Sequence, residues 1–144
     1  IACTNPISAA VEAFRALDTR RIAVVTPYTA DVTVPIAQHF TDAGLEVTAL
    51  GSFLEPSDLV VARISEASIA EGVRTIAGRA DCDAVFVSCT SLRSMAAADA
   101  LEREVAMPVV SSNIALLWHL LRLAGVTDDV PGRGSLFSRQ LVAR

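Results

Sequence analysis

A cysteine follows the apolar run Ala84–Ser88, where that run breaks into the polar residues Cys89, Thr90 and Ser91. The run predicts a buried strand, and the residues from about Leu92 to Val105 predict a helix after it. Unpaired backbone N–H groups at a helix N-terminus favour a thiolate and could hold an anionic substrate oxygen near Thr90 and Ser91. Such a thiol could act as a nucleophile or a proton donor, but a buried cysteine is as readily a small apolar core residue.

Two further polar groups follow predicted strands elsewhere in the chain. Tyr28, the single tyrosine, comes just after the apolar run Arg21–Thr26, and Asp58 ends a polar loop. The tyrosine hydroxyl could donate to a substrate carboxylate, or the ring could be a packing lid with a polar tip. Asp58 could contact substrate or simply end its loop. Arg93, one helical turn past Cys89, could pair with a carboxylate or point to solvent.

The other cysteines and the helical histidine carry weaker signals. Cys82 lies in a polar turn and is interpreted as structural, whereas Cys3 near the start of the chain has no assigned role. His119 sits in an apolar helical stretch, which is typical of a core histidine. Three cysteines without metal-ligand spacing predict neither a disulfide framework nor a zinc site. Cysteines outside a disulfide framework favour a reducing compartment, so we expect a cytoplasmic protein.

Apolar runs of strand length alternate with helical stretches along the chain. Strands are predicted over 21–26, 46–50, 84–88 and 108–112, and helices over about 29–43, 66–77, 92–105 and 113–123. Val32, Ile36 and Phe40 are expected on the buried face of the first helix, and Asn113 is expected to cap the last. The alternation requires crossover connections, which predicts an α/β fold: a doubly wound, flavodoxin-like, four-stranded parallel sheet with helices on both faces.

This predicted sheet would bring the candidate residues to one edge. Ligands of open parallel sheets bind beyond the carboxyl ends of the strands, where Tyr28, Asp58 and Cys89 are expected to lie. The tail after Gly125 is rich in turn residues and is predicted to be irregular. The sequence contains no phosphate-binding glycine motif, so nucleotide binding has no motif to support it.

Composition excludes several classes of partner. The chain has 144 residues, of which 52% are hydrophobic and 19% charged, so it can bury the core of one domain. The formal net charge of -4 leaves no basic surface for nucleic acid. No apolar run approaches the roughly 20 residues needed to span a bilayer. We therefore expect neither nucleic-acid binding nor membrane insertion.

Four motifs occur in an order that resembles a known family. They resemble the second half of the aspartate/glutamate racemase superfamily, in its maleate isomerase and arylmalonate decarboxylase branch. Within that branch the chain is most similar to the ectoine-utilisation protein A group, which shares the Ser-Cys-Thr-Ser-Leu-Arg and Ser-Ser-Asn runs. The similarity extends from about Pro6 to about Leu136. The motifs are Val24–Tyr28, Asp58–Ile64, Phe86–Arg93 and Pro108–Asn113.

The resemblance implies a fold of two α/β halves related by a pseudo-twofold axis, each giving one position of a shared active site. It implies that no metal or organic cofactor takes part. Residues 1–144 would form one α/β domain with a βα core over 21–113, and about 1–20 and 114–144 would pack on an N-terminal half or in a homo-oligomer. Cys89 would be the catalytic residue of this half, Tyr28 would donate to the substrate carboxylate, and backbone donors of Thr90 and Ser91 would hold it.

Two departures from the family pattern bear on the substrate. Cys3 lies too close to Cys89 in the sequence to match the cysteine of the first half, whose counterpart is expected upstream of Ile1. Asp58 falls where maleate isomerases carry an asparagine that binds the dicarboxylate. An ionised aspartate there would repel a second carboxylate, which favours a substrate with an amine, amide or amidine near that end.

Three functions of different kinds remain open at this stage. The sequence favours a cofactor-independent, cysteine-based isomerase or racemase acting on a small carboxylate, similar to maleate isomerase and with a possible place in ectoine degradation. An arylmalonate-type decarboxylase is the alternative enzyme, because Cys89 could equally protonate an enediolate. A non-catalytic module that binds a small molecule is the alternative outside enzymes. A flavodoxin-like signalling domain would need an acidic cluster or flavin loop that the sequence does not show.

Overall fold

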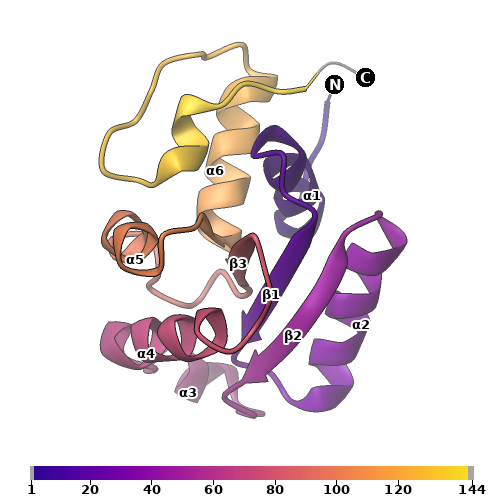
Figure 1. The fold of residues 1–144 in the computed structure, drawn as a ribbon, viewed down its shortest axis with the longest axis vertical. Coiled ribbons are helices and arrows are strands. Elements are labelled where there is room, and N and C mark those ends of the chain that lie inside the picture. The colour runs from indigo at the N-terminus through magenta and orange to yellow at the C-terminus, as the bar shows by residue number, and fades with distance from the viewer. Residues whose placement is uncertain (1, 143–144) are drawn as a thin grey trace.

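A four-stranded parallel sheet forms the centre of the chain in a computed structural model, which describes residues 2–142 (Figure 1). The strand order is β2-β1-β3-β4, and all three pairings are parallel. The predicted doubly wound α/β fold is therefore confirmed. The strands are β1 (Arg21–Thr26), β2 (Glu46–Ser52), β3 (Ala84–Val87) and β4 (Val109–Ser111).

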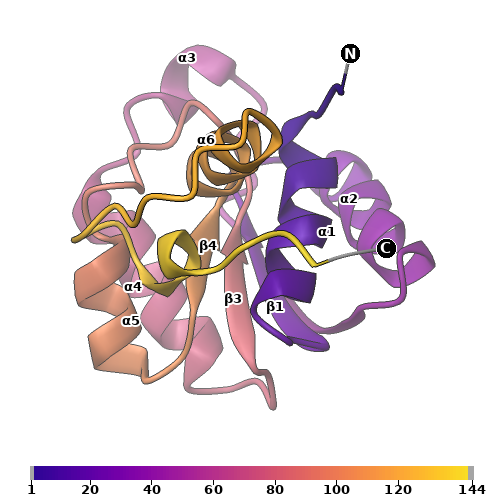
Figure 2. The ribbon, with the colours of Figure 1, turned by 90° about the horizontal axis from the view of Figure 1, so that it is seen from above.

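Helices cover both faces of this sheet (Figure 2). One face packs against α1 (Pro6–Ala16), α2 (Ala30–Asp42) and α6 (Ser112–Leu123). The other face packs against α4 (Glu66–Ala77) and α5 (Ala98–Val105). Successive side chains of a strand point to opposite faces, so Ile22 and Val24 join the first core while Ala23 and Val25 join the second. This explains why the central strands read as continuous apolar runs.

Three phenylalanines from separate elements fix the first core. Phe14 of α1, Phe40 of α2 and Phe86 of β3 are fully buried. Their ring centroids lie 5.0–6.3 Å apart in edge-to-face arrangements, a geometry that adds to the free energy gained by burying the rings. These contacts lock both helices over the strand that leads to Cys89.

Helix α1 had no counterpart among the helices predicted from sequence. Its start has clear local signals, because the Asn5 side chain accepts from the backbone N–H of Ile7 and Ser8, and Pro6 occupies the first turn. The helix packs on α6 and inserts Phe14 into the core of this chain. The prediction that residues 1–20 also pack on a further half stays a prediction.

The predicted buried face of α2 was partly wrong. Phe40 is fully buried, but Val32 is 42% exposed. The buried positions are Thr33, Ala37 and Phe40, because the Thr33 hydroxyl hydrogen-bonds Thr26 at the end of β1. A polar contact with the strand end therefore sets the rotation of this helix, and the pattern of large apolar residues does not.

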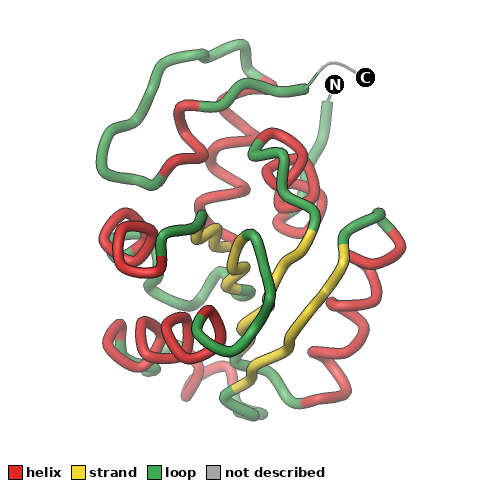
Figure 3. The backbone as a smooth tube through the Cα atoms, viewed as in Figure 1, coloured by secondary structure: helices red, strands yellow, loops and turns green. Residues whose placement is uncertain are grey.

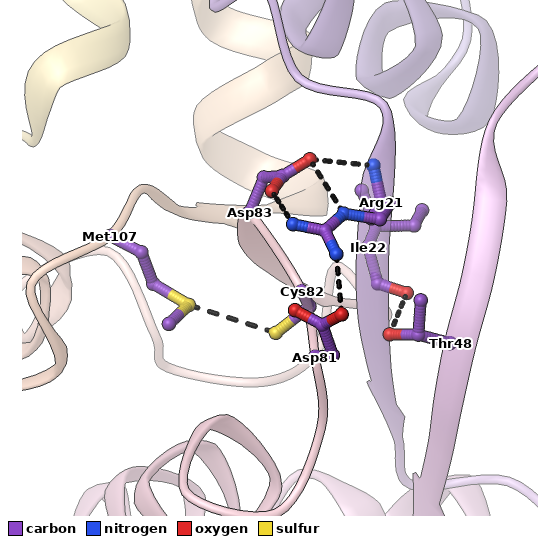
Figure 4. Close-up of polar contacts among 7 residues, drawn as sticks. All are labelled: Arg21, Ile22, Thr48, Asp81, Cys82, Asp83 and Met107. Atoms are coloured by element: carbon purple, nitrogen blue, oxygen red, sulfur yellow. Dashed lines mark hydrogen bonds and ion pairs between the residues drawn. The ribbon is translucent and has the colours of Figure 1, made fainter.

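Arg21 ties the amino ends of β1 and β3 together (Figure 4). Its guanidinium lies 2.8 Å from Asp83 and 2.5 Å from Asp81, and its backbone N–H also donates to Asp83. These hydrogen bonds hold the pKa of the Asp83 carboxyl below its usual range. In the same turn the Cys82 thiol lies 3.7 Å from the Met107 sulfur, and burial raises the pKa of this thiol.

A buried arginine organises the C-terminal segment that follows α6, drawn as a long loop in Figure 3. The Arg122 side chain is 6% exposed and donates to four backbone carbonyls. Trp118 donates to one of the same carbonyls, that of Arg139, over 3.0 Å. The predicted irregular tail is correct except for a short 3₁₀ turn, Ser135–Ser138, which inserts Leu136 and Phe137 into the core. The four carbonyls belong to Val126, Asp128, Phe137 and Arg139.

Candidate functional site

The connections of the sheet diverge between β1 and β3. From β1 the chain crosses to β2 at one edge, and from β3 it crosses to β4 at the other. In doubly wound sheets this switch point is where ligands bind. Tyr28 follows the carboxyl end of β1, and Cys89 follows that of the adjacent β3. The sheet therefore places both candidate residues side by side.

Tyr28 and Cys89 are in direct contact through their side chains. The Tyr28 ring packs against the core cluster that contains Cys89, and the Cys89 thiol and the Asp58 carboxylate both act on the phenol hydroxyl. Burial, followed by these two groups, raises the pKa of Tyr28 above its ordinary value. The hydroxyl therefore keeps its proton at neutral pH and is available as a donor to sulfur or to a bound carboxylate.

The backbone at Tyr28 is held from two sides. Its carbonyl accepts from the hydroxyls of Ser52, at the end of β2, and Thr33, in α2. Thr33 in turn lies 2.7 Å from the Thr26 hydroxyl in a buried contact. These bonds fix the turn that carries the ring, so the Tyr28 hydroxyl is directed by rigid elements.

The raised pKa of Tyr28 predicts a distinctive alkaline titration. The chain has one tyrosine, so tyrosinate absorbance reports this residue alone. In the folded protein ionisation is expected well above pH 10, and in urea it should return to the ordinary value of about 10. Because the folded state keeps the proton that the unfolded state loses, stability should fall as pH rises above about 10. Equal midpoints in spectrophotometric titrations of folded and unfolded protein would contradict this environment.

The loop after Cys89 differs from its prediction. Residues 90–97 form turns, and α5 begins only at Ala98, so Cys89 does not lie at the N-terminus of the helix expected from about Leu92. The Asn113 amide donates to the carbonyls of Thr90 (3.0 Å) and Leu92 (3.5 Å). These side-chain bonds occupy carbonyls that an early helix would use. Asn113 is also not the cap of α6, because the Ser111 hydroxyl accepts there from Ile114 N–H.

Cys89 itself has an unusual backbone conformation. Its φ is +116°, a region that residues with a Cβ rarely adopt and that costs on the order of 1–3 kcal/mol. Its N–H donates to the buried Ser112 hydroxyl over 3.1 Å. The Ser91 N–H donates to the Cys89 sulfur over 3.3 Å. Cys89 is buried, with 7% of the residue exposed.

The other residues predicted for the site are exposed to solvent. Asp58 is the first residue of the short helix α3 (Asp58–Val61) and is exposed. Thr90, Ser91 and Arg93 are also exposed. Beside Asp58, Leu59 is 79% exposed, an unusual state for a leucine next to a candidate site. Within the residues described, the site is thus walled on one side by the sheet and open on the other.

A model of the arylmalonate decarboxylase family matches residues 1–137. The chain belongs to this family. The arylmalonate decarboxylase of Bordetella bronchiseptica is 34% identical over 137 residues, which cover 94% of this chain and 57% of that protein. A maleate isomerase of Pseudomonas putida is 30% identical over 131 residues, covering 90% of this chain and 52% of that protein. The chain therefore spans about half the length of these relatives.

The family is also evident in a solved structure. A mutant of the Nocardia farcinica maleate cis-trans isomerase, with a covalently bound succinylcysteine intermediate, superposes with a TM-score of 0.81 at 27% identity. The match covers 92% of this chain and 54% of that one. This family member thus shares its fold with an enzyme whose mutant holds a covalent succinylcysteine intermediate.

Other polar groups of the family member lie away from the switch point. Cys3 is exposed. The prediction of a core histidine is confirmed, because His119 is 7% exposed, stacks on Trp118 and lies 2.8 Å from the Thr4 hydroxyl. A cavity of about 750 Å³ lies between β2 and α4, and neither Tyr28 nor Cys89 lines it. The site geometry rather than cavity size therefore identifies the candidate site.

Two absences hold for residues 2–142. No three His, Cys, Asp or Glu side chains are grouped so that they could hold a metal ion. Among the helices that the structure describes, none is long and apolar enough to cross a bilayer. The expectation that the reaction uses no metal or organic cofactor stays a prediction.

Ser112 and Asn113 are functional candidates that the sequence did not assign. The sequence placed both in a Ser-Ser-Asn run at the end of a strand and gave Asn113 only the role of a helix cap. Their position at the carboxyl end of β4, beside β3, was the one signal that could have directed attention to them. Their contacts to the Cys89 loop join residues more than twenty positions apart, which no local pattern predicts.

Proposed function

We propose that this chain supplies Cys89 as the reactive residue of a cofactor-independent enzyme, an isomerase or racemase acting on a small carboxylate. The observation that carries the proposal is that Tyr28 and Cys89 lie side by side at the switch point of the sheet, where β1 and β3 end. Membership of a family that includes maleate isomerases supports the same chemistry. Within that family we propose a place beside the ectoine-utilisation protein A group, whose Ser-Cys-Thr-Ser-Leu-Arg and Ser-Ser-Asn runs this chain shares.

The proposed isomerisation starts from the Cys89 thiolate. Its sulfur adds to one carbon of a double bond next to the substrate carboxylate, and the electron pair moves onto that carboxylate as an enediolate. Tyr28 and the backbone donors of Thr90 and Ser91 stabilise the charge that develops there. The former double bond is now single and rotates. The enediolate then expels the thiolate, which restores the double bond with the opposite geometry and leaves no net change in electrons or protons.

A racemase would use the same thiol in a different way. Cys89 would deliver or remove the proton on the carbon next to the carboxylate, and a second group on the opposite face would do the reverse. Because the chain spans about half of its relatives, we propose that a second α/β half supplies that group. The exposed Leu59, Thr90 and Ser91 would then face it. A second copy of the chain is the other source of that group. Measuring the molecular mass of the complete protein in solution distinguishes a second half within one chain from a dimer.

An arylmalonate-type decarboxylase is the second candidate, favoured by the 34% identity to such an enzyme. In that reaction one carboxylate leaves as CO₂, and the electron pair of the broken bond forms an enediolate. The Cys89 thiol then protonates the enediolate carbon and later regains a proton from solvent. Release of CO₂ from phenylmalonate without turnover of maleate or aspartate would favour this candidate.

We propose a cytoplasmic enzyme. Cys82 and Cys89 are free thiols, which fits the reducing compartment that keeps thiols available. A non-catalytic binding module remains the contrasting function. It would bind a small carboxylate at Tyr28 and Cys89 and release it unchanged, with no product in an assay that detects isomerisation, racemisation and CO₂ release.

Asp58 is proposed to select the substrate. Its carboxylate acts electrostatically on the Tyr28 hydroxyl, so a substrate held by Tyr28 also meets this negative charge. That charge repels a second carboxylate and attracts an amine or amidine. The expected substrate is therefore a small carboxylate that carries a nitrogen cation, rather than a plain dicarboxylate.

Exchange of this charge predicts a change of substrate preference. Asp58→Asn in the complete protein should raise kcat/KM for maleate about tenfold, because one repulsive contact is removed and an amide donor is gained. The same variant should lose activity on an amine-bearing substrate such as aspartate. Steady-state assays on both compounds test the prediction, with Asp18→Asn, an exposed aspartate remote from the site, as control. Equal effects on the two substrates would show that Asp58 does not select charge.

A further inference from the structure

The N-terminus of α6 contacts the loop that carries Cys89 at several points. The Ser112 hydroxyl accepts from Cys89 N–H over 3.1 Å, in a contact buried from solvent. The Asn113 amide donates to the carbonyls of Thr90, over 3.0 Å, and Leu92, over 3.5 Å. Two consecutive residues of one helix therefore bind three backbone groups of the loop, those of Cys89, Thr90 and Leu92.

These contacts offset a local strain. Cys89 has a φ of +116°, and a loop of this kind would relax toward an allowed region if its polar groups were free. In the first turn of α6, Ser112 and Asn113 are anchored by the Ser111 cap and by Ile114 and Ala115, which are fully packed in the core. The packed first turn of α6 thus holds the Cys89 backbone in its strained conformation.

We infer that Ser112 and Asn113 are positioning residues, a clamp that orients Cys89 and its neighbouring backbone donors toward a bound carboxylate. The inference rests on the proposed function of Cys89 and extends it to two residues that touch neither the substrate nor the sulfur. With the clamp in place, the Ser91 N–H points to the Cys89 sulfur and the Tyr28 hydroxyl meets the same atom. Without it, these donors no longer converge on one point.

Two alkylating reagents of similar size test this convergence. Iodoacetate carries a carboxylate and iodoacetamide carries a neutral amide, and both transfer a two-carbon group to a thiolate with loss of iodide. At one cysteine the ratio of the two rates cancels differences in exposure and ionisation, and it reports recognition of the carboxylate. Cys3, exposed and remote from the loop in sequence, provides the reference ratio within the same molecule.

In the complete protein, Cys89 is expected to prefer iodoacetate about tenfold relative to Cys3, as measured by peptide mass spectrometry. Ser112→Ala and Asn113→Leu should each reduce this preference to within about twofold of the Cys3 ratio. Asn113→Leu keeps the approximate size of the side chain and removes its donors without adding a charge. Ser112→Thr, which keeps the hydroxyl, should restore the preference. Ser65→Ala removes a helix cap at α4 and is a control of comparable stability cost away from the loop.

The outcomes separate this inference from the function it rests on. Wild-type protein without any iodoacetate preference at Cys89 would overturn the carboxylate site itself. A wild-type preference that survives both Ser112→Ala and Asn113→Leu would overturn the clamp and leave the proposed function standing. Loss of preference in the Ser65→Ala control as well would show that general stability, not positioning, is being measured, and would likewise overturn the clamp.

Discussion

Replacing Cys89 by alanine in the complete protein is expected to lower kcat by about a thousandfold or more on the best substrate among maleate, aspartate and phenylmalonate. The thiol is the group proposed to form the bond or move the proton in each reaction, so no other side chain at the switch point can substitute for it. Loss of a proton-transfer group typically costs about 10²–10⁴-fold. Because the change removes only the sulfur atom and alanine has the same Cβ at this φ of +116°, the variant should fold normally.

Matched cysteine variants separate this role from a general need for thiols. Cys82→Ala and Cys3→Ala should each keep kcat within about threefold, because Cys82 lies in the turn at the amino end of the sheet and Cys3 is exposed. Thermal unfolding of all three variants checks that loss of activity is not loss of fold. Full activity in Cys89→Ala, with a native melting temperature, would remove Cys89 from the chemistry.

The second large effect concerns stability. Arg122→Leu is expected to lower the free energy of unfolding by about 3 kcal/mol or more, because four buried or partly buried carbonyls lose their donor. For a domain of this size such a loss corresponds to a fall in melting temperature of roughly 10 °C. The segment containing Leu136 and Phe137 should detach first, because the guanidinium joins it to α6.

An exposed arginine supplies the control for this variant. Arg103 pairs with Asp99 one turn away in α5, and its side chain is 70% exposed. Arg103→Leu should change the free energy of unfolding by less than about 0.5 kcal/mol, since exposed pairs contribute little. Urea unfolding followed by circular dichroism measures both variants. Equal small effects would show that the C-terminal segment holds its place without Arg122.

Much of the fold could be predicted because its signals are local. Buried parallel strands read as continuous apolar runs, and Ile22 and Val24 on one face and Ala23 and Val25 on the other show why. The crossover rule then fixed the parallel sheet. The buried face of α2 was wrong at Val32 because a hydroxyl pair between Thr33 and Thr26 decides its rotation, and apolar periodicity does not register such a pair.

In the candidate site, too, the features with local signals were predicted and those set by long-range contacts were not. That Tyr28 and Cys89 meet followed from their places after strands, since carboxyl ends of parallel strands share one edge. The helix expected directly after Cys89 was wrong, because the Asn113 amide holds the loop carbonyls from a distant part of the chain. Long-range bonds between side chain and backbone leave no trace in sequence spacing, and the positive φ of Cys89 has none either.

The most direct test of a reactive Cys89 is its alkylation by iodoacetamide in the complete protein, with and without a small carboxylate, read for each cysteine by peptide mass spectrometry. A saturating amount of the right carboxylate should slow labelling of Cys89 at least tenfold and leave Cys3 and Cys82 unchanged, and the protecting compound then indicates the substrate class. If Cys89 labels at the same rate with maleate, aspartate, phenylmalonate or none, the thiol does not lie in a carboxylate site and the proposed chemistry is contradicted.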